Sequence, residues 1–191
     1  MGRWEPGARQ RLVLAAVDLF TEQGYDATTV AQIAERAGVT KSTFFRHFPD
    51  KRELLVAGQE SMCQLLSEGI AEAPDGASPM VAVAAALERA STMMGPDNRE
   101  LGPRIKAAVA ASTELQERDA LKTVSLAAAM TTALLARGVP EMTAHLAGEL
   151  GVLAFKQGYA RWSESEQSGR GLAEYALAAL DELRTASRSL D

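Results

Sequence analysis

A run of short polar and basic residues between positions 40 and 47 carries the side chains that nucleic-acid recognition needs. Cationic groups suit phosphates, while hydroxyl and imidazole groups suit the base edges of the major groove. The polar members of the run are Thr40, Lys41, Ser42, Thr43, Arg46 and His47. Val39, Phe44 and Phe48 recur among them at helical spacing and can anchor the segment inward. The pattern predicts a helix that presents a polar face to duplex DNA, and a solvated basic helix is the alternative.

The residues around this run predict the elements that must position it. Residues 9–23 form an amphipathic helical pattern that Gly24 ends. Thr29 can cap a second helix to residue 37, and after a Gly-containing turn Thr40 can cap a third helix over residues 41–48. Pro49 closes that helix, because the residue before a proline disfavours helical geometry. Two short helices joined by such a turn, the second of them basic, indicate a helix-turn-helix.

The same stretch resembles the DNA-binding signature of TetR-family transcriptional regulators. The resemblance covers about residues 9–58 and is carried by the run from Thr29 to Leu54, TVAQIAERAGVTKSTFFRHFPDKREL. The preceding segment, FTEQGYDATT, is similar to the end of the first helix in that family. The family implies a three-helix DNA-binding head followed by a larger helical domain for ligand binding and dimerisation.

The resemblance also implies roles for individual residues. Thr29 would meet a phosphate at the start of the second helix, and Lys51 would hold a backbone phosphate. The groove-facing residues would be Lys41, Ser42, Thr43, Arg46 and His47, and Thr40, which caps the same helix, is included in the DNA-binding set. Phe45 stands where the family commonly has tyrosine, so it is expected to contact sugar or a thymine methyl without a phosphate hydrogen bond. Ser42 replaces a common glycine or alanine and could add a polar contact.

Arginines near the amino end suggest a further DNA contact. Arg3, Arg9 and Arg11 could form an arm that reaches phosphate or the minor groove. A solvated tail is the alternative interpretation. We expect limited non-specific affinity with a strong dependence on salt.

The charge distribution agrees with a chain that meets a polyanion at one end. The net charge is −5, yet residues 1–52 carry eight basic and six acidic side chains, against 12 and 19 in the remainder. Between Arg36 and Arg52, five basic groups face the single acidic Asp50. An acidic body with a basic head favours local binding to DNA over general adhesion.

The remaining chain reads as helix throughout, because alanine, leucine, glutamate and arginine dominate and alternating strand patterns are scarce. Residues 50–53 have capping-box spacing, which predicts one long fourth helix to about residue 72. Further helices are expected at about residues 79–94, 98–111, 114–137, 140–164 and 172–187. The prediction is an all-α fold of about nine helices, with a DNA-binding domain at residues 1–53 and a ligand-binding and dimerisation domain at residues 54–191.

The last two predicted helices offer faces for a homodimer. Leu146, Leu150, Leu153 and Trp162 mark one stripe, and small residues mark another face of the same helix. Glycine inside a helix is unfavourable, so several of them suggest a close helix approach. The residues assigned to the dimer interface are Gly151, Ala154, Gly158, Trp162, Tyr175, Ala179 and Leu183. Tight packing inside one subunit is the alternative.

Methionines in the same half point to a small-molecule pocket, because methionine adapts to irregular cavities. The candidate ligand-binding residues are Met62, Met93, Met94, Arg104, Met130 and Leu134. Each methionine could instead fill the core, and Arg104 could be a solvated surface group rather than a site for an anionic head group.

Other classes of protein find little support. The sequence has two histidines and one cysteine, and it has no glycine-rich phosphate loop or nucleophile elbow, so we expect neither an enzyme nor a cofactor or metal. No run of about 18 apolar residues and no signal peptide is apparent, which predicts a cytoplasmic protein without a membrane partner. The expected function is a dimeric repressor that a small-molecule effector releases from a palindromic double-stranded operator. A ligand-independent DNA-binding factor or an activator is the alternative.

Overall fold

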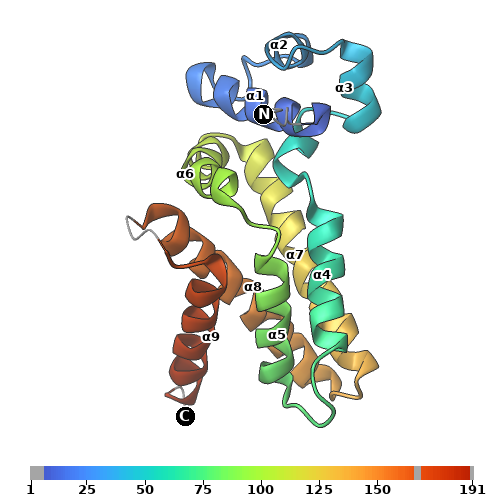
Figure 1. The fold of residues 1–191 in the computed structure, drawn as a ribbon, viewed down its shortest axis with the longest axis vertical. Coiled ribbons are helices and arrows are strands. Elements are labelled where there is room, and N and C mark those ends of the chain that lie inside the picture. The colour runs from blue at the N-terminus through green and yellow to red at the C-terminus, as the bar shows by residue number, and fades with distance from the viewer. Residues whose placement is uncertain (1–6, 166–168, 190–191) are drawn as a thin grey trace, which may run out of the picture. The chain divides into compact units, whose positions relative to one another are not determined.

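A computed structural model of the chain describes residues 7–165 and 169–189, and within these residues the fold is helical without strands (Figure 1). The predicted all-α class is therefore confirmed. The elements, in order, are α1 (Ala8–Gln23), α2 (Val30–Arg36), α3 (Lys41–His47), the short 3-10 helix η1 (Arg52–Val56), α4 (Gln59–Ala71), α5 (Pro79–Ser91), α6 (Pro96–Ala110), α7 (Thr113–Ala136), α8 (Glu141–Glu164) and α9 (Leu172–Arg188).

Contacts divide the chain into two compact units. The first takes in the chain up to Ala57 together with Arg104–Ala120, and the second takes in Gly58–Pro103 and the chain from Leu121 onward. The chain thus passes between the units after residues 57, 103 and 120. The predicted boundary after residue 53 stays a prediction, while the contacts add the end of α6 and the start of α7 to the unit that holds the helix-turn-helix.

The first unit is built around the buried faces of its three amino-terminal helices. Leu12, Ile33 and Phe44 are fully buried, and Phe20 packs edge-on against Tyr25. Leu115, from the added segment, is also fully buried in this cluster. The burial of these apolar side chains explains why such short helices hold their positions, because helices of seven residues are not stable alone.

Polar contacts fix the added segment to the same unit. The Arg118 guanidinium donates two hydrogen bonds to the Glu53 carboxylate, at 2.7 and 2.9 Å, and the Tyr25 hydroxyl donates to Glu114 at 2.9 Å. Arg104 pairs with Asp18 of α1. These contacts join residues more than 60 positions apart in the sequence, so the end of α6 and the start of α7 belong structurally to the helix-turn-helix.

The long fourth helix predicted from residue 50 to about residue 72 is wrong. The capping chemistry itself is present, because the Asp50 carboxylate accepts from the backbone N–H of Arg52 at 2.8 Å and of Glu53 at 3.3 Å. The turn that it opens is η1, which ends at Val56. Gly58 then adopts a left-handed conformation with φ of 89°, and α4 starts only after it. A left-handed residue cannot continue a right-handed helix, so the helix is interrupted there.

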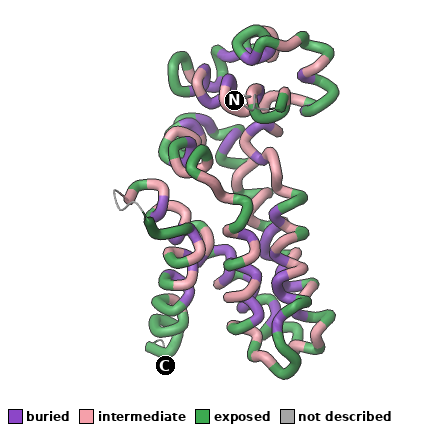
Figure 2. The backbone as a smooth tube through the Cα atoms, in the orientation of Figure 1, coloured by how far each residue is buried: buried purple, intermediate pink, exposed green. Residues whose placement is uncertain are grey.

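The second unit packs α4 against α5 and α8 against α9, with α5 also touching both α8 and α9. Its fully buried side chains include Ile70, Leu87, Met130 and Leu134. Buried and exposed residues alternate along these helices, as expected where each helix has one face in a core (Figure 2).

Two arginines connect the helices of this unit. Arg89 of α5 pairs with Glu68 and Glu72 of α4. The Arg137 guanidinium donates to the carbonyls of Ile70, Ala71, Ala73 and Pro74. It thereby satisfies carbonyl groups that the end of α4 leaves without helical partners.

Candidate nucleic-acid interface

The helix α3 separates an apolar anchor from a polar face within seven residues. Phe44 is fully buried and Phe48, which follows the helix, is 2% exposed, whereas Phe45 is 56% exposed. Lys41, Ser42, Phe45, Arg46 and His47 are all exposed. The buried rings hold α3 on its unit, so its outward side chains are presented from a fixed backbone.

Threonine hydroxyl groups cap the amino end of α3. The Thr40 hydroxyl accepts from the backbone N–H of Thr43 at 3.1 Å, and the two hydroxyl groups lie 3.0 Å apart. Arg46 approaches the Thr43 hydroxyl at 3.4 Å, one helical turn further on. The predicted cap at Thr40 is therefore confirmed, and Thr43 is half-buried in a local hydrogen-bond cluster beside the exposed Arg46.

Helix α2 is capped in the same way. Thr29 accepts from the Gln32 backbone N–H at 3.3 Å, while the Gln32 side chain accepts from the Thr29 backbone N–H at 2.8 Å. This reciprocal pair is a capping box. The α2–α3 turn passes through Gly38, whose φ of 66° suits glycine. Thr29 is exposed at the start of α2, where a helix terminus favours an anion.

Lys51 is held inside its own unit to a greater extent than its predicted role suggests. Its ammonium donates to the carbonyls of Tyr25 at 2.7 Å and Thr28 at 3.0 Å, and it lies 3.9 Å from the centre of the Tyr25 ring. An ammonium has three donors. Two of them join the α1–α2 connection to the segment after α3, so Lys51 has a structural role beside any contact with phosphate.

The arginines that the structure describes, Arg9 and Arg11, do not form the predicted amino-terminal arm. Arg9 lies over the Phe48 ring at 5.2 Å, and Arg11 donates to the Ala37 carbonyl at 3.1 Å. Both belong to α1 and pack on the helix-turn-helix, because a guanidinium can cover an aromatic face and satisfy a helix-terminal carbonyl. Arg3, the third residue of that prediction, lies outside the described residues.

Carboxylates pair with the arginines on either side of α3, so the basic groups of α3 itself produce the positive electrostatic potential at this surface. Arg36 pairs with Glu22 at 2.7 Å, and the hydrogen bond to Arg36 lowers the pKa of Glu22. Arg52 pairs with Asp50 at 2.6 Å, which likewise lowers the pKa of Asp50. Arg36 and Arg52 are thus neutralised by partners, while Lys41 and Arg46 stand on the exposed face. Sequence counting missed this difference, because it treats all basic residues in the segment alike.

The predicted ligand-binding residues divide between the two units. Met62, Met130 and Leu134 are buried in one apolar cluster of the second unit, and Met94 packs against that cluster. Met93 is 36% exposed. Arg104 belongs to the first unit, where it pairs with Asp18, so the structure does not group it with the methionines.

The residues predicted for a dimer interface lie largely inside the second unit. Ala154 and Ala179 are fully buried, and Trp162 is 5% exposed. A Cβ atom on Gly158 would lie 2.5 Å from the Ala176 Cα atom of α9, and one on Gly151 would lie 2.6 Å from the Met130 sulfur. The glycines therefore allow close packing within the subunit, which is the alternative that the sequence left open.

Two further members of that set, Tyr175 and Leu183, are half-buried on α9. The Tyr175 hydroxyl lies 2.8 Å from the Ser165 hydroxyl. Sequence patterns do not distinguish a close approach inside one chain from one between two chains.

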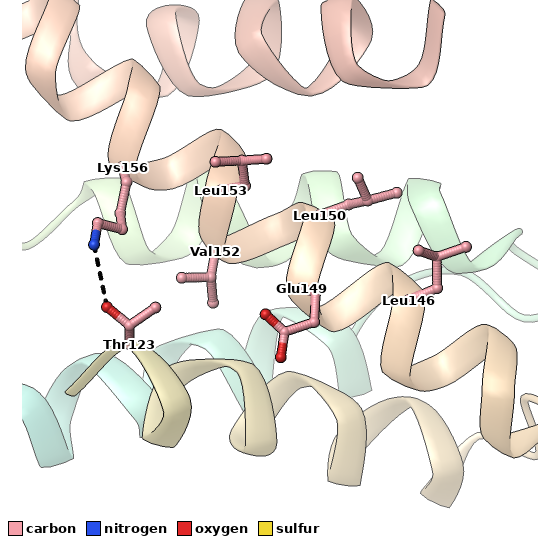
Figure 3. Close-up of a pocket in the computed structure, with 7 residues that line it drawn as sticks. All are labelled: Thr123, Leu146, Glu149, Leu150, Val152, Leu153 and Lys156. Carbon is pink, nitrogen blue, oxygen red and sulfur yellow. Dashed lines mark hydrogen bonds between the residues drawn. The ribbon is translucent and has the colours of Figure 1, made fainter. Parts of the chain in front are cut away.

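A shallow groove of about 350 Å³ runs along α8 beside α7, and sequence analysis did not predict it as a pocket (Figure 3). Its lining is Thr123, Leu146, Glu149, Leu150, Val152, Leu153 and Lys156. The feature of the sequence that could have indicated this groove is the stripe of Leu146, Leu150 and Leu153. In the part of the chain that the structure describes, no group of three histidine, cysteine, aspartate or glutamate side chains could hold a metal ion.

Comparison with known proteins identifies the amino-terminal unit. Residues 12–57 match the family described as bacterial regulatory proteins, tetR family. The HTH-type transcriptional regulator TcmR of Streptomyces glaucescens is 37% identical over 90 residues, which cover 43% of this chain and 40% of TcmR. The match thus spans less than half of that regulator's length and lies in a minor part of each protein.

Solved structures show the same fold over nearly the whole chain. A TetR-family transcriptional regulator from Syntrophomonas wolfei superposes with a TM-score of 0.62 at 18% identity, covering 94% of both chains. Thermus thermophilus FadR, a TetR-family repressor in complex with lauroyl-CoA, superposes with a TM-score of 0.51 at 21% identity, covering 91% of both chains. Residues 12–57 are thus a DNA-binding domain of the tetR family of bacterial regulatory proteins, and the whole chain has the fold of the solved structures of such regulators.

Proposed function

We propose that this chain is a dimeric transcriptional repressor that binds a palindromic operator and leaves it when a small molecule binds the second unit. The observation that carries the proposal is the geometry of α3. Its anchor Phe44 is fully buried, and the same helix exposes Lys41, Ser42, Arg46 and His47. A short, rigidly held helix with an exposed polar face fits the major groove of B-DNA.

Within this proposal, the predicted residues have different tasks. Arg46 and His47, at the exposed end of α3, read base edges, and Lys41 at its start binds phosphate. Thr29 binds a second phosphate at the capped start of α2, where backbone N–H groups and the helix dipole favour an anion. Ser42 and the Phe45 ring contribute contacts to the bases and the sugars between them.

Dimerisation supplies the second recognition helix. A single seven-residue helix contacts only a few base pairs, so two copies related by a two-fold axis are needed for a long palindromic site. The two heads must then present their α3 helices about 34–36 Å apart, which is one turn of B-DNA. The ligand acts by changing this spacing.

The proposed ligand is apolar and enters the methionine-containing core of the second unit. Met62, Met130 and Leu134 pack there with Met94 at the margin, and flexible methionine side chains can rearrange around a guest. The lauroyl-CoA complex of Thermus thermophilus FadR, a protein of the same fold, supports this class of ligand. α4 follows directly on Gly58, so a displaced α4 would act on the first unit through that glycine. A coupling of about 1–3 kcal/mol is enough for a useful switch.

Duplex binding by two variants tests the DNA part of this function. Arg46→Ala should weaken binding to the preferred sequence by about 1–3 kcal/mol and relax the preference for it over other sequences. Lys41→Ala should weaken binding to all sequences alike, because its contact is with phosphate. Glu60→Ala, at an exposed position of α4 outside the first unit, is the matched control. Fluorescence anisotropy with two duplexes measures all three, and parent-like binding by both variants would refute the placement of α3.

A titration tests the ligand part. Medium-chain acyl-CoA, whose acyl chain is apolar, and uncharged apolar compounds should lower operator affinity about 5- to 150-fold if they bind the second unit. Isothermal titration calorimetry identifies which compounds bind, and anisotropy then reports the effect on DNA. If every compound that binds leaves operator affinity unchanged, the protein is a ligand-independent regulator and the release mechanism is wrong.

A further inference from the structure

We propose that the side-chain oxygen of Gln59 is a polar contact for the effector, and that the effector is an apolar molecule bearing an uncharged hydrogen-bond donor, a hydroxyl or an amide N–H. The inference rests on the proposed ligand-released function and narrows the class of ligand that the second unit takes. Gln59 is the first residue of α4 and directly follows Gly58. Sequence analysis did not include it among the candidate ligand-binding residues.

The Gln59 side chain carries a buried acceptor that the protein does not use. Its Oε1 atom is closed to solvent, and within the described residues it has no hydrogen-bond partner. The residue as a whole is half-buried, so part of it lies at the surface. Buried polar atoms in native proteins nearly always have a partner, because an unpaired one costs the free energy of its lost hydration. An unpaired amide oxygen therefore indicates a donor that comes from outside the chain.

Helical spacing places this oxygen at the end of an apolar stripe. Gln59, Met62 and Leu66 stand at i, i+3 and i+7 on α4, which is one face of a helix. Met62 is 4% exposed and Leu66 is 1% exposed, and both belong to the apolar cluster that also contains Met130. The amide thus lies on the face of α4 that we propose to contact the ligand.

The α7 helix does not supply the missing donor along this part of α4. The Cys63 thiol donates to the Ser125 carbonyl of α7 at 3.8 Å, and one turn further on the Ser67 hydroxyl donates to another α7 carbonyl at 3.4 Å. Gln59 lies one turn before Cys63 on the same line. A carbonyl oxygen accepts and cannot donate, so the groups that serve the thiol and the hydroxyl cannot serve an amide oxygen.

The hydroxyl groups at the end of α5 are also engaged. Figure 1 shows α5 beside α4, and the two helices pack together. The Ser91 hydroxyl donates to the Leu87 carbonyl at 2.7 Å, and the Thr92 hydroxyl donates to the Arg89 carbonyl at 2.7 Å. Each hydroxyl has a single proton to donate. Both donors are therefore spent on carbonyls of their own helix.

A flexible side chain stands next to Gln59 and can give way to a guest. The methyl group of Met93 lies 3.6 Å from the position that a Cβ atom on Gly58 would take, which is ordinary contact. Met93 is 36% exposed, and its neighbour Met94 packs against the apolar cluster. Methionine has three rotatable bonds and adapts to irregular partners, so these two side chains can move aside at small cost.

The surroundings decide which kind of donor fits. A charged ammonium next to Met62 and Leu66 would lose its hydration without gaining an opposite charge, and such burial is costly. A hydroxyl or an amide N–H loses less and satisfies the oxygen. The hydrogen bond would form in the first turn of α4, directly after the left-handed Gly58, where a shift of α4 acts on the connection to the first unit.

Matched pairs of compounds test the donor on the full chain. The pairs are para-hexylphenol with para-hexylfluorobenzene, naphthol with fluoronaphthalene, and decanol with fluorodecane, in which fluorine replaces the hydroxyl and cannot donate. Isothermal titration calorimetry should show tighter binding of the hydroxyl compound in at least one pair, by about fivefold for one net hydrogen bond. Equal affinity within each pair, or no binding by any of the six compounds, would overturn the inference.

Two variants test the residue. Gln59→Met has similar length without the oxygen, so it should abolish the preference for the hydroxyl compound. It should also raise the melting temperature of the ligand-free protein by about 2–4 °C, because the unpaired acceptor is gone. Gln64→Met is the matched control, since Gln64 is exposed on the same helix and donates to Glu68 at 2.8 Å. The control should keep the preference and should not raise the melting temperature.

The remaining outcomes separate this inference from the proposed function. A preference that survives in Gln59→Met, or a ligand-free Gln59→Met protein that is less stable than the parent, would overturn the role of Gln59; the second result would show that water already satisfies the oxygen. Hydroxyl compounds that bind with the expected preference but leave operator affinity unchanged would uphold Gln59 and refute ligand release. Compounds that release the operator without any preference within a pair would uphold ligand release and overturn the inference.

Discussion

At the scale of single residues, Phe45 and Phe44 show how one position decides between core and contact. Phe44 is fully buried, whereas its neighbour Phe45 is 56% exposed and meets the Phe44 ring edge-on at 5.3 Å. Contact with Phe44 thus covers only part of Phe45, and more than half of the residue is open to solvent. Its apolar edge is suited to sugars and thymine methyl groups in a groove.

Phe45→Tyr should therefore strengthen DNA binding. The added hydroxyl can donate to a phosphate oxygen, and a net hydrogen bond of about 1 kcal/mol corresponds to about fivefold in affinity. Phe45→Ala, which removes the ring, should weaken binding in the same assay. Anisotropy titrations with one duplex measure both variants. A tyrosine variant weaker than the parent would show that the ring lies against an apolar surface with no phosphate in reach.

Tyr25 gives the first unit a dependence on alkaline pH. Its burial, together with the hydrogen bond to Glu114, raises the pKa of its hydroxyl above the ordinary value of 10.0. The folded state thus favours the neutral phenol, and this contribution to stability is complete below pH 10 and is lost as the pH rises above it. Tyr25→Phe should lower the free energy of unfolding by about 1 kcal/mol at pH 7 through the lost hydrogen bond.

Urea titrations at pH 7 and above pH 10 check this prediction. The difference between parent and Tyr25→Phe should shrink at the higher pH, because only the parent has a phenol to ionise at this site. An equal difference at both values would mean that the Tyr25 hydroxyl does not contribute to the pH dependence.

Residue types were read correctly from the sequence where the chemistry is local. The caps at Thr29 and Thr40 follow from hydroxyl groups placed just before a helix, and both are present. The partners of Lys51 and Arg11 could not be predicted, because each bonds to a carbonyl 23 to 26 residues away. Such contacts depend on how the helices pack.

At the scale of elements, hydrophobic periodicity and turn residues predict most helix bounds. They do not predict that the helix is interrupted at Gly58. The sequence from residue 50 to 72 has a good cap and an apolar face, so a continuous helix was expected. The available signal was Gly58 itself, whose φ of 89° is accessible to glycine at little cost. The same break separates the residues of the two compact units.

The α8–α9 contact depends on the absence of a side chain at Gly158. In an uncrowded helix, alanine is more stable than glycine by about 1 kcal/mol. Here a Cβ atom would lie 2.5 Å from the Ala176 Cα atom, and backbone atoms cannot move aside cheaply. Gly158→Ala should therefore lower the free energy of unfolding by about 1–3 kcal/mol.

Gly95→Ala is the matched control, because nothing lies within 4 Å of its Cβ position. It should change stability by no more than about 0.5 kcal/mol. Urea unfolding followed by circular dichroism measures both. An alanine at position 158 that stabilises the protein would mean that α9 shifts freely and that the close contact is not needed.

At the scale of the whole chain, the sequence indicated a basic head and an acidic body, and the structure adds how the charges are used. Several basic groups of the head are neutralised by carboxylates, as in Arg36 with Glu22 and Arg52 with Asp50. Lys41 and Arg46 remain on the exposed face of α3. The composition predicts that the electrostatic potential of the head is positive. It does not predict which side chains produce this potential, because the ion pairs depend on how the helices pack.

The assignment of residues to units also lay beyond the sequence. Nothing in the pattern at residues 104–120 distinguishes them from the rest of the helical body, yet Leu115 is fully buried in the core of the first unit. Leu115 lies in the same buried cluster as Tyr25 and Phe20, so α7 packs with residues some 90 positions earlier in the sequence. Long-range packing of this kind is decided by shape, which residue spacing does not contain.

Selection of bound duplexes from a random pool tests the central claim most directly. The full chain, bound at low salt and washed at increasing salt, should enrich a palindromic sequence whose half-sites lie about one helical turn apart, centre to centre. The Arg46→Ala variant, selected in parallel, should enrich that sequence less or not at all. A pool that stays random after repeated rounds with the folded parent protein would contradict the account.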